Sequence, residues 1–202
     1  MPASRLGPTE WVNAGLKALA RFGYAALKAD TLANRLRVSR GSFYWHFAHV
    51  SAFHAAILRR WREIARANII DHIDSAAENR LEALLTLTFS ASSEMERAVR
   101  AWATFDAQAK SAVEAVDAER IGYLRKLLVD AGISPKAAET RARIMNWAYL
   151  GFALSSNTLD RESLKGVVGD LSQLAHLKPQ PFSEETRRPQ AVPRTRRRRA
   201  KP

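Results

Sequence analysis

Residues 32–47 read LANRLRVSRGSFYWHF, and this stretch decides the fold of the N-terminal part of the chain. Leu32 is followed four residues later by a second leucine, so both fall on one face of a short helix. Val38 can fill a turn, and Phe43 lies four residues before another phenylalanine, which seats a second helix. This spacing is that of a helix-turn-helix. An ordinary three-helix core has the same apolar spacing, but the basic residues beside it favour a DNA-binding unit.

The start of the second helix carries the residues that could contact DNA. Ser39 is expected to be the N-cap, which leaves backbone N–H groups and the positive end of the helix pointing outward. In a helix-turn-helix this end enters the major groove. Arg40 can then make a bidentate contact to a guanine, while Ser42 and Tyr44 can donate to phosphates.

The run Ser39-Arg40-Gly41-Ser42-Phe43-Tyr44-Trp45-His46-Phe47 resembles the recognition helix of TetR-family transcriptional regulators. Gly23, at the end of the preceding helix, and the pair Leu32-Ala33 also match that family. The resemblance is specific over about 45 residues. Residues 100–151 are similar to the family only in the order of their helices.

The resemblance implies a homodimeric repressor that binds a palindromic DNA operator and is released from it by a small molecule, with no other cofactor. The family's operator contacts and their supports fall on Ser39, Arg40, Gly41, Ser42, Tyr44, Trp45 and His46. Lys28 falls near a position that contacts the DNA backbone.

Two positions depart from the family pattern. Arg37 stands where a turn glycine is common, so it has to adopt a left-handed backbone or a different turn. The residues after Phe47 supply no lysine for phosphate contact. We therefore expect Arg35, Arg37 and the C-terminal tail to contribute more of the affinity for the DNA backbone.

Charge is concentrated at the two ends of the chain. Residues 1–50 carry seven basic and two acidic residues, and residues 178–202 carry nine basic and two acidic residues. These ends have net charges of +5 and +7, so residues 51–177 are neutral within the total of +12. Polyanion binding is therefore assigned to the ends, and the middle is free for packing, ligand or partner contacts.

Apolar residues recur at intervals of three and four after Thr9, which predicts an all-α protein of about nine helices. We expect a flexible N-terminus (1–8), a helix-turn-helix domain (9–50), a ligand-sensing and dimerisation domain (51–177) and a disordered basic tail (178–202). A long helix over 51–72 would link the two domains. Expected helix ends include an N-cap at Thr9, a capping box of Ser93 with Glu96, a stop at Gly132 and an N-cap at Ser134.

The neutral middle is rich in aromatic residues, which mostly build core in helical proteins. The family resemblance instead implies an apolar pocket between the long helix and the next three helices. The candidate ligand-binding residues are Trp61, Phe89, Trp102, Phe105, Tyr123 and Trp147.

The last two helices carry small and apolar residues that fit a four-helix dimer interface. These candidates are Ala148, Gly151, Phe152, Ser155, Val167, Leu171 and Leu174. The same residues could equally form a core within one chain.

Other functions have weak support in the sequence. It contains no cysteine, no glycine-rich phosphate loop and no motif of a known catalytic nucleophile, so no catalytic residue is assigned. The spacing of His46, His49 and His54 lacks a carboxylate pair for metal. The longest uncharged stretch, 144–159, is too short to span a membrane, and we expect a cytoplasmic protein. Alternatives are an architectural DNA-binding protein without a ligand, a helical small-molecule-binding protein or an enzyme; RNA binding lacks the usual aromatic platform.

Overall fold

The computed structural model describes residues 6–70, 80–155, 159–175 and 177, and the regular structure in this part of the chain is entirely helical. The predicted all-α class with about nine helices is confirmed. The predicted basic tail lies outside the described residues, as do residues 1–5. None of the described helices combines the length and apolar content that a membrane span requires. The elements are α1 (Pro8–Phe22), the 3-10 turn η1 (Tyr24–Leu27), α2 (Ala29–Leu36), α3 (Arg40–Tyr44), α4 (Val50–Ile70), α5 (Arg80–Ser90), α6 (Glu94–Ala103), α7 (Ala107–Asp130), α8 (Pro135–Leu154) and α9 (Arg161–Leu174).

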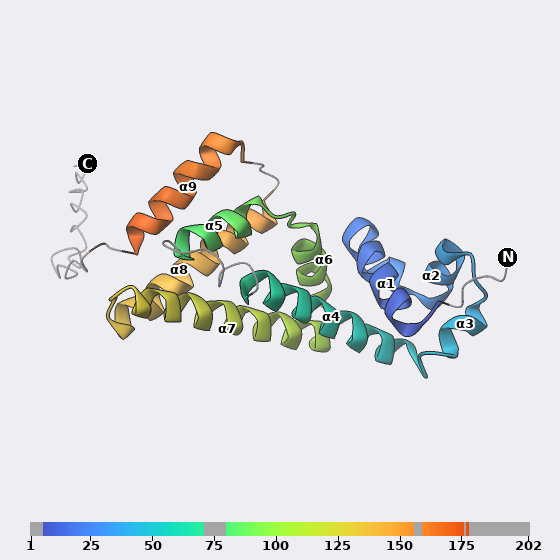
Figure 1. The fold of residues 1–202 in the computed structure, drawn as a ribbon. Coiled ribbons are helices and arrows are strands. Elements are labelled where there is room, and N and C mark those ends of the chain that lie inside the picture. The colour runs from blue at the N-terminus through green and yellow to red at the C-terminus, as the bar shows by residue number, and fades with distance from the viewer. Residues whose placement is uncertain (1–5, 71–79, 156–158, 176, 178–202) are drawn as a thin grey trace, which may run out of the picture.

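The three N-terminal helices form a small group at one end of the molecule, and the long α4 leads away from it alongside α7 (Figure 1). Ion pairs of Glu119 on α7 with Arg62 and Arg66 on α4, at 3.0 and 3.4 Å, join these two helices. Helices α5, α8 and α9 form the opposite end. Helix α6 packs on α1, α7 and α8, so it lies between the two ends of the molecule.

The turn between α2 and α3 shows which of the two expected backbone conformations Arg37 adopts. Arg37 is left-handed, with φ 56° and ψ 40°. Its N–H donates to the Asn34 carbonyl, and the N–H of Val38 donates to the Ala33 carbonyl, at 3.2 and 3.1 Å. These two bonds form a Schellman motif, which usually has glycine at the left-handed position. An arginine therefore occupies the place of the helix-ending glycine.

Of three predicted helix ends, two are wrong and one is confirmed. Helix α1 begins at Pro8 with Gly7 as N-cap, so the predicted cap at Thr9 is wrong, because a proline suits the first helical position. Ser93 is the N-cap of α6 but its side chain makes no capping bond, and Glu96 turns toward arginines on α6 and α7. The predicted capping box is therefore also wrong. The stop at Gly132 is confirmed, with φ 85°.

One apolar core runs from the DNA-binding helices into the rest of the molecule. It contains Trp11 and Phe43 from the N-terminal group, Phe53 from α4, and Trp102 from α6. Helix α1 lies directly on α4, because a Cβ added to Gly15 would lie 2.5 Å from Ile57 Cδ1. The helix-turn-helix thus shares its apolar core with α4 and α6.

Two further apolar clusters hold the other end together. One joins α5, α7, α8 and the end of α9 around Leu128 and Met145. The other joins α5 to α8 and α9 around Phe89 and Val168. Buried Arg141 on α8 adds a bond from Nη1 to the Ala175 carbonyl at 2.5 Å, which fixes the end of α9.

Candidate DNA interface and effector site

Helix α3 presents its N-terminal residues to solvent. Ser39 is its N-cap, as predicted, although its hydroxyl makes no capping bond. Most of the predicted DNA-contacting side chains are exposed, and Ser42 and His46 are half-buried. The exposed ones are Lys28, Arg37, Ser39, Arg40, Tyr44 and Trp45, with Gly41 exposed beside them. The structure thus places eight of the nine positions on or beside α3 and the turn before it, and Lys28 at the N-terminus of α2; their contacts with DNA remain a prediction.

The opposite side of α3 is fixed by Phe43. Its side chain is fully buried, and its ring packs edge-on against Trp11 and Phe53 at centroid distances of 5.4 and 5.2 Å. Phe47 packs against the same ring at 5.3 Å. These contacts fix the rotation of α3 about its axis, so Arg40 and Tyr44 face away from the core.

Arg40 is held in place by two neighbours. Its Nη2 donates to the Tyr44 hydroxyl at 3.3 Å, and its Nε lies 3.2 Å from Asp30 Oδ1 on α2. The hydrogen bond to Tyr44 and the charge of Asp30 both raise the pKa of Arg40. Sequence reasoning selected Arg40 and Tyr44 but missed Asp30, because ten residues separate it from Arg40 and only the folded turn brings them together.

An aromatic joint connects the DNA-binding helices to the regulatory helices. Tyr24 of η1 packs against Trp102 of α6 and His54 of α4, both at 5.3 Å between ring centroids. His54 and Trp102 also pack edge-on at 5.1 Å. Phe105 covers Tyr24 at 5.2 Å from the outside. The joint thus places α6 in direct contact with η1 and α4.

His54 is buried in this joint. Burial lowers its pKa, although the nearby charge of Asp106 and a hydrogen bond to the Leu27 carbonyl oppose the shift. Nε2 of the ring has no hydrogen-bond partner among the described residues. The neutral imidazole is therefore the form that fits the folded protein.

A narrow apolar cavity of about 50 Å³ lies between α5, α7 and α8. Its apolar walls are formed by Leu84, Leu85, Phe89, Leu124 and Met145. Polar groups reach it from Thr88, Arg120, Tyr123, Asn146 and Tyr149. An apolar space with a few polar groups is typical of a small-molecule site.

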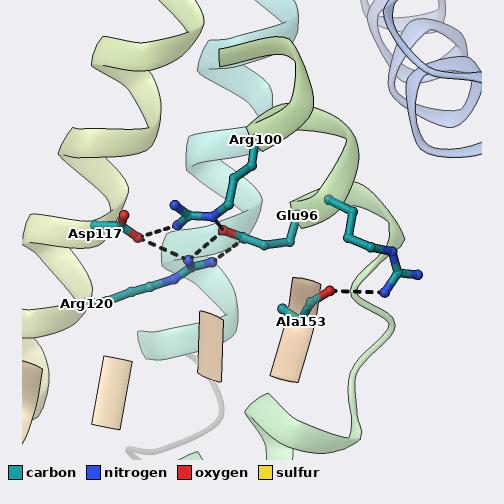
Figure 2. A network of polar contacts seen from close by, with 6 residues as sticks. Glu96, Arg100, Asp117, Arg120 and Ala153 are labelled. Atoms are coloured by element: carbon teal, nitrogen blue, oxygen red, sulfur yellow. Dashed lines mark hydrogen bonds and ion pairs between the residues drawn. The ribbon is translucent and has the colours of Figure 1, made fainter. Parts of the chain in front are cut away.

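Arg120 belongs both to this cavity and to a buried ion network (Figure 2). Its guanidinium donates to both carboxylate oxygens of Glu96, at 3.0 and 2.8 Å. Arg100 donates to Glu96 at 2.6 Å and to Asp117 at 2.5 Å. Two cations and two anions from α6 and α7 thus balance each other where little solvent reaches.

Glu96 is the centre of the network, with only 5% of its side chain exposed. Burial alone would raise its pKa, but Arg120 and Arg100 together hold the pKa below its ordinary value. The carboxylate therefore stays ionised. On the cavity side, the Arg120 guanidinium lies 5.0 Å from the centre of the Tyr149 ring, and burial raises the pKa of that phenol.

Residues 12–49 match the family model of bacterial regulatory proteins of the tetR family. These residues are the helix-turn-helix and the helix before it. Residues 12–49 therefore form a DNA-binding domain of the TetR family. No curated protein matches the chain as a whole.

Solved structures show that the fold extends beyond the matched domain. A transcriptional regulator from Rhodococcus sp. Rha1 is 20% identical, with a TM-score of 0.69 over 86% of this chain and 100% of its own. A member of the TetR family from Streptomyces coelicolor A3 is 18% identical, with a TM-score of 0.61 over 84% and 98%. The multidrug binding protein EbrR, complexed with malachite green, is 18% identical, with a TM-score of 0.60 over 81% and 96%. The chain therefore has the fold of a TetR-family DNA-binding transcriptional regulator, a family whose members are generally not enzymes.

In the structure, the six predicted ligand-binding residues do not come together. Phe89 and Tyr123 line the cavity. Trp61 and Trp102 are buried in the core that continues into the DNA-binding helices, because their apolar faces complete that core. Phe105 and Trp147 are 66% and 62% exposed and lie away from the cavity. The cavity lies between α5, α7 and α8, whereas the sequence placed it beside α4.

Apart from Tyr123, the polar residues of the cavity were missed for a physical reason. Arg120 is one of many charged residues on α7, and in the sequence it is indistinguishable from a residue on a solvent-exposed face. Asn146 and Tyr149 are surrounded by the apolar residues of α8. Their proximity to Arg120 depends on how α7 and α8 pack, and nothing in the sequence records it.

The predicted dimer residues have mixed environments. Phe152, Val167 and Leu171 are half-buried against α5 and Phe89 within the same chain, and Ala148 joins them. Gly151 is exposed, and Ser155 and Leu174 are half-buried. Beside them α8 leaves an apolar stripe in solvent, formed by Ile144, Trp147 and Leu154.

The ion network predicts a large asymmetry between two glutamates. Glu96→Ala leaves Arg100 and Arg120 without their shared anion in a buried site, so we expect a loss of about 3–5 kcal/mol in the free energy of unfolding. Glu63, which pairs with Arg60 in solvent, is the matched control. Glu63→Ala should cost less than about 1 kcal/mol. Urea unfolding followed by circular dichroism measures both, and equal losses would contradict a buried network.

The aromatic joint predicts a pH dependence. The pKa of His54 is lower in the folded chain than its ordinary value of 6.5, so the unfolded chain binds more protons as the pH falls below 6.5. The contribution of His54 to stability is therefore complete above pH 6.5 and is lost as the pH falls toward the lowered pKa. When the pH is lowered from 7.5 to 5.5, the free energy of unfolding in urea should fall less for His54→Phe than for the wild type. If this free energy falls equally in the two proteins, the group that titrates is not His54.

Proposed function

We propose that the protein is a cytoplasmic homodimeric repressor that binds a palindromic operator through α3 and leaves it when a small molecule enters the cavity between α5, α7 and α8. The observation that carries this proposal is the position of Arg120. One guanidinium lines the cavity and also fixes α6 through Glu96. Helix α6 in turn packs on the DNA-binding helices through Trp102 and Tyr24.

The coupling follows from differential binding. A ligand changes operator affinity only if it binds one arrangement of the helices better than another. A ligand that accepts a hydrogen bond from Arg120 competes with Glu96 and so favours a different position of α6. Because Tyr24 packs against Trp102 and His54, that change also alters the position of the DNA-binding helices, including α3.

The cavity also limits the chemistry of the effector. Its walls are mostly apolar, and the charge of Arg120 is already balanced by Glu96, so an ionic ligand would bring an unbalanced charge into a buried site. A mainly apolar molecule with a hydrogen-bond acceptor fits best. The cavity is narrow, so Phe89 or Met145 has to move to admit a ligand much larger than a few waters. The similarly folded EbrR binds malachite green, which supports a small-molecule role for this fold.

The apolar stripe on α8 supports the homodimer. Ile144, Trp147 and Leu154 lie at intervals of three and seven along the helix, so they share one face, and all three are exposed. A two-fold axis at this stripe brings the same residues of two copies together. The two α3 helices could then contact half-sites ~34–36 Å apart.

Selection of bound duplexes from a random DNA pool tests the operator. The wild-type protein should enrich a palindrome. Arg40→Ala should lose the preference at one base pair of each half-site, by about 1–3 kcal/mol of discrimination, because that side chain makes the proposed bidentate contact. Sequence-independent binding would instead favour an architectural DNA-binding protein, and enrichment of the same palindrome by Arg40→Ala would remove Arg40 from the readout.

Repression is tested with the same operator, placed between a promoter and a reporter gene. Wild-type protein should lower reporter expression, and Arg40→Ala should not. Higher expression with the wild type would show activation rather than repression.

The α8 stripe is tested by Trp147→Glu. A charge at the centre of an apolar interface should convert the dimer to a monomer, whereas Trp45→Glu, at another exposed tryptophan, should not. Light scattering coupled to gel filtration measures the mass of each. If Trp147→Glu remains a dimer, the interface lies on another surface.

A further inference from the structure

Asp30 and Arg40 form an ion pair across the helix-turn-helix. Asp30 lies in the first turn of α2, where the positive end of the helix favours a carboxylate. Leu32 and Ala33, buried in the core, fix that helix. Asp30 therefore offers Arg40 a fixed anchor from a different helix, 3.2 Å from the guanidinium Nε.

Stability does not explain this pair. The two side chains are 63% and 62% exposed, and ion pairs of this kind contribute little to folding. The pair lies instead on the surface that DNA would cover, beside the N-terminus of α3. When DNA excludes water there, the attraction between the two charges becomes stronger.

In this geometry, the end of the Arg40 guanidinium that would contact a base remains available. The Asp30 carboxylate forms an ion pair on the Nε side of the guanidinium, and the Tyr44 hydroxyl accepts one N–H of Nη2. A guanidinium has more N–H donors than these two contacts use, and the remaining ones are on Nη1 and Nη2. These two nitrogens form the end-on fork that matches O6 and N7 of guanine. Held from the side by Asp30, Arg40 loses less side-chain freedom when it binds the base.

Asp30 also carries a cost for binding. A carboxylate on this surface repels phosphates and cancels one positive charge of the DNA-binding face. Its effect on binding to any sequence is therefore unfavourable, while its effect on the Arg40 contact is favourable. The two effects together widen the difference between operator and other DNA.

We propose that Asp30 is a positioning residue that determines sequence specificity: it orients the Arg40 fork for one guanine and lowers the affinity for other sequences. The inference rests on the proposed operator binding. It predicts that loss of the carboxylate weakens discrimination and strengthens non-specific binding at the same time.

The test compares Asp30→Asn with Glu10→Gln. Both variants remove one negative charge from the DNA-binding helices and keep the size of the side chain, but Glu10 lies on α1, is exposed and does not pair with Arg40. The wild type and both variants are titrated with the selected operator, with operators altered at the base pair that depends on Arg40, and with a scrambled duplex. Fluorescence anisotropy at two salt concentrations gives the affinities.

Asp30→Asn should bind the scrambled duplex more tightly than wild type and should lose roughly two- to fivefold of the discrimination at the Arg40-dependent base pair. Glu10→Gln should leave that discrimination unchanged. Unchanged or increased discrimination in Asp30→Asn would overturn the proposal. A wild-type protein that prefers no sequence would instead overturn the proposed function, and this inference with it.

A second measurement tests the ion pair without DNA. In the wild type, the Arg40 Nε–H signal in a ¹H–¹⁵N spectrum should exchange more slowly with water than in Asp30→Asn, because the carboxylate lies 3.2 Å from Nε. Asp30→Asn should speed its exchange, and Glu10→Gln should not. Equal exchange in all three proteins would also overturn the proposal.

Discussion

A buried carboxylate with two arginines is the interaction on which the rest of this structure depends. Glu96 is removed from solvent and stays ionised because Arg100 and Arg120 both reach it. The network fixes the short helix α6 to α7 by directed contacts rather than by apolar packing alone. An apolar surface can slide by a fraction of a residue, but a carboxylate with paired guanidiniums has few alternative arrangements. Helix α6 therefore has a well-defined position.

That position matters because α6 contacts both functional ends of the molecule. Trp102 continues the core of the DNA-binding helices, and Arg97 donates to the carbonyl of Ala153 at the end of α8, at 3.0 Å. The aromatic joint at Tyr24 brings α6 into contact with η1 and α4. Cavity, ion network and joint are thus arranged in series from α8 to α3.

The sequence predicted local features well and long-range ones poorly. The residues around the turn, from Leu32 to Phe47, determine their structure through neighbours in the chain, so the helix-turn-helix and the unusual backbone at Arg37 could both be anticipated. Glu96 shows the opposite case. Ser93 and Glu96 have the spacing of a capping box, but arginines on two helices compete for that carboxylate, and one of them lies 24 residues away. From the sequence, Trp102 could likewise belong to the core or to a ligand pocket, and only the packing of the helices places it in the core.

Arg37 adds a consequence for how the DNA-binding turn can vary. A left-handed conformation costs a non-glycine residue about 1–2 kcal/mol, so glycine at this position would give a more stable turn. The Schellman bonds are made by backbone atoms, and they hold the turn whatever side chain stands there. Arginine at position 37 therefore lowers the stability of the turn but adds a positive charge beside the recognition helix. The backbone hydrogen bonds that orient this helix stay the same.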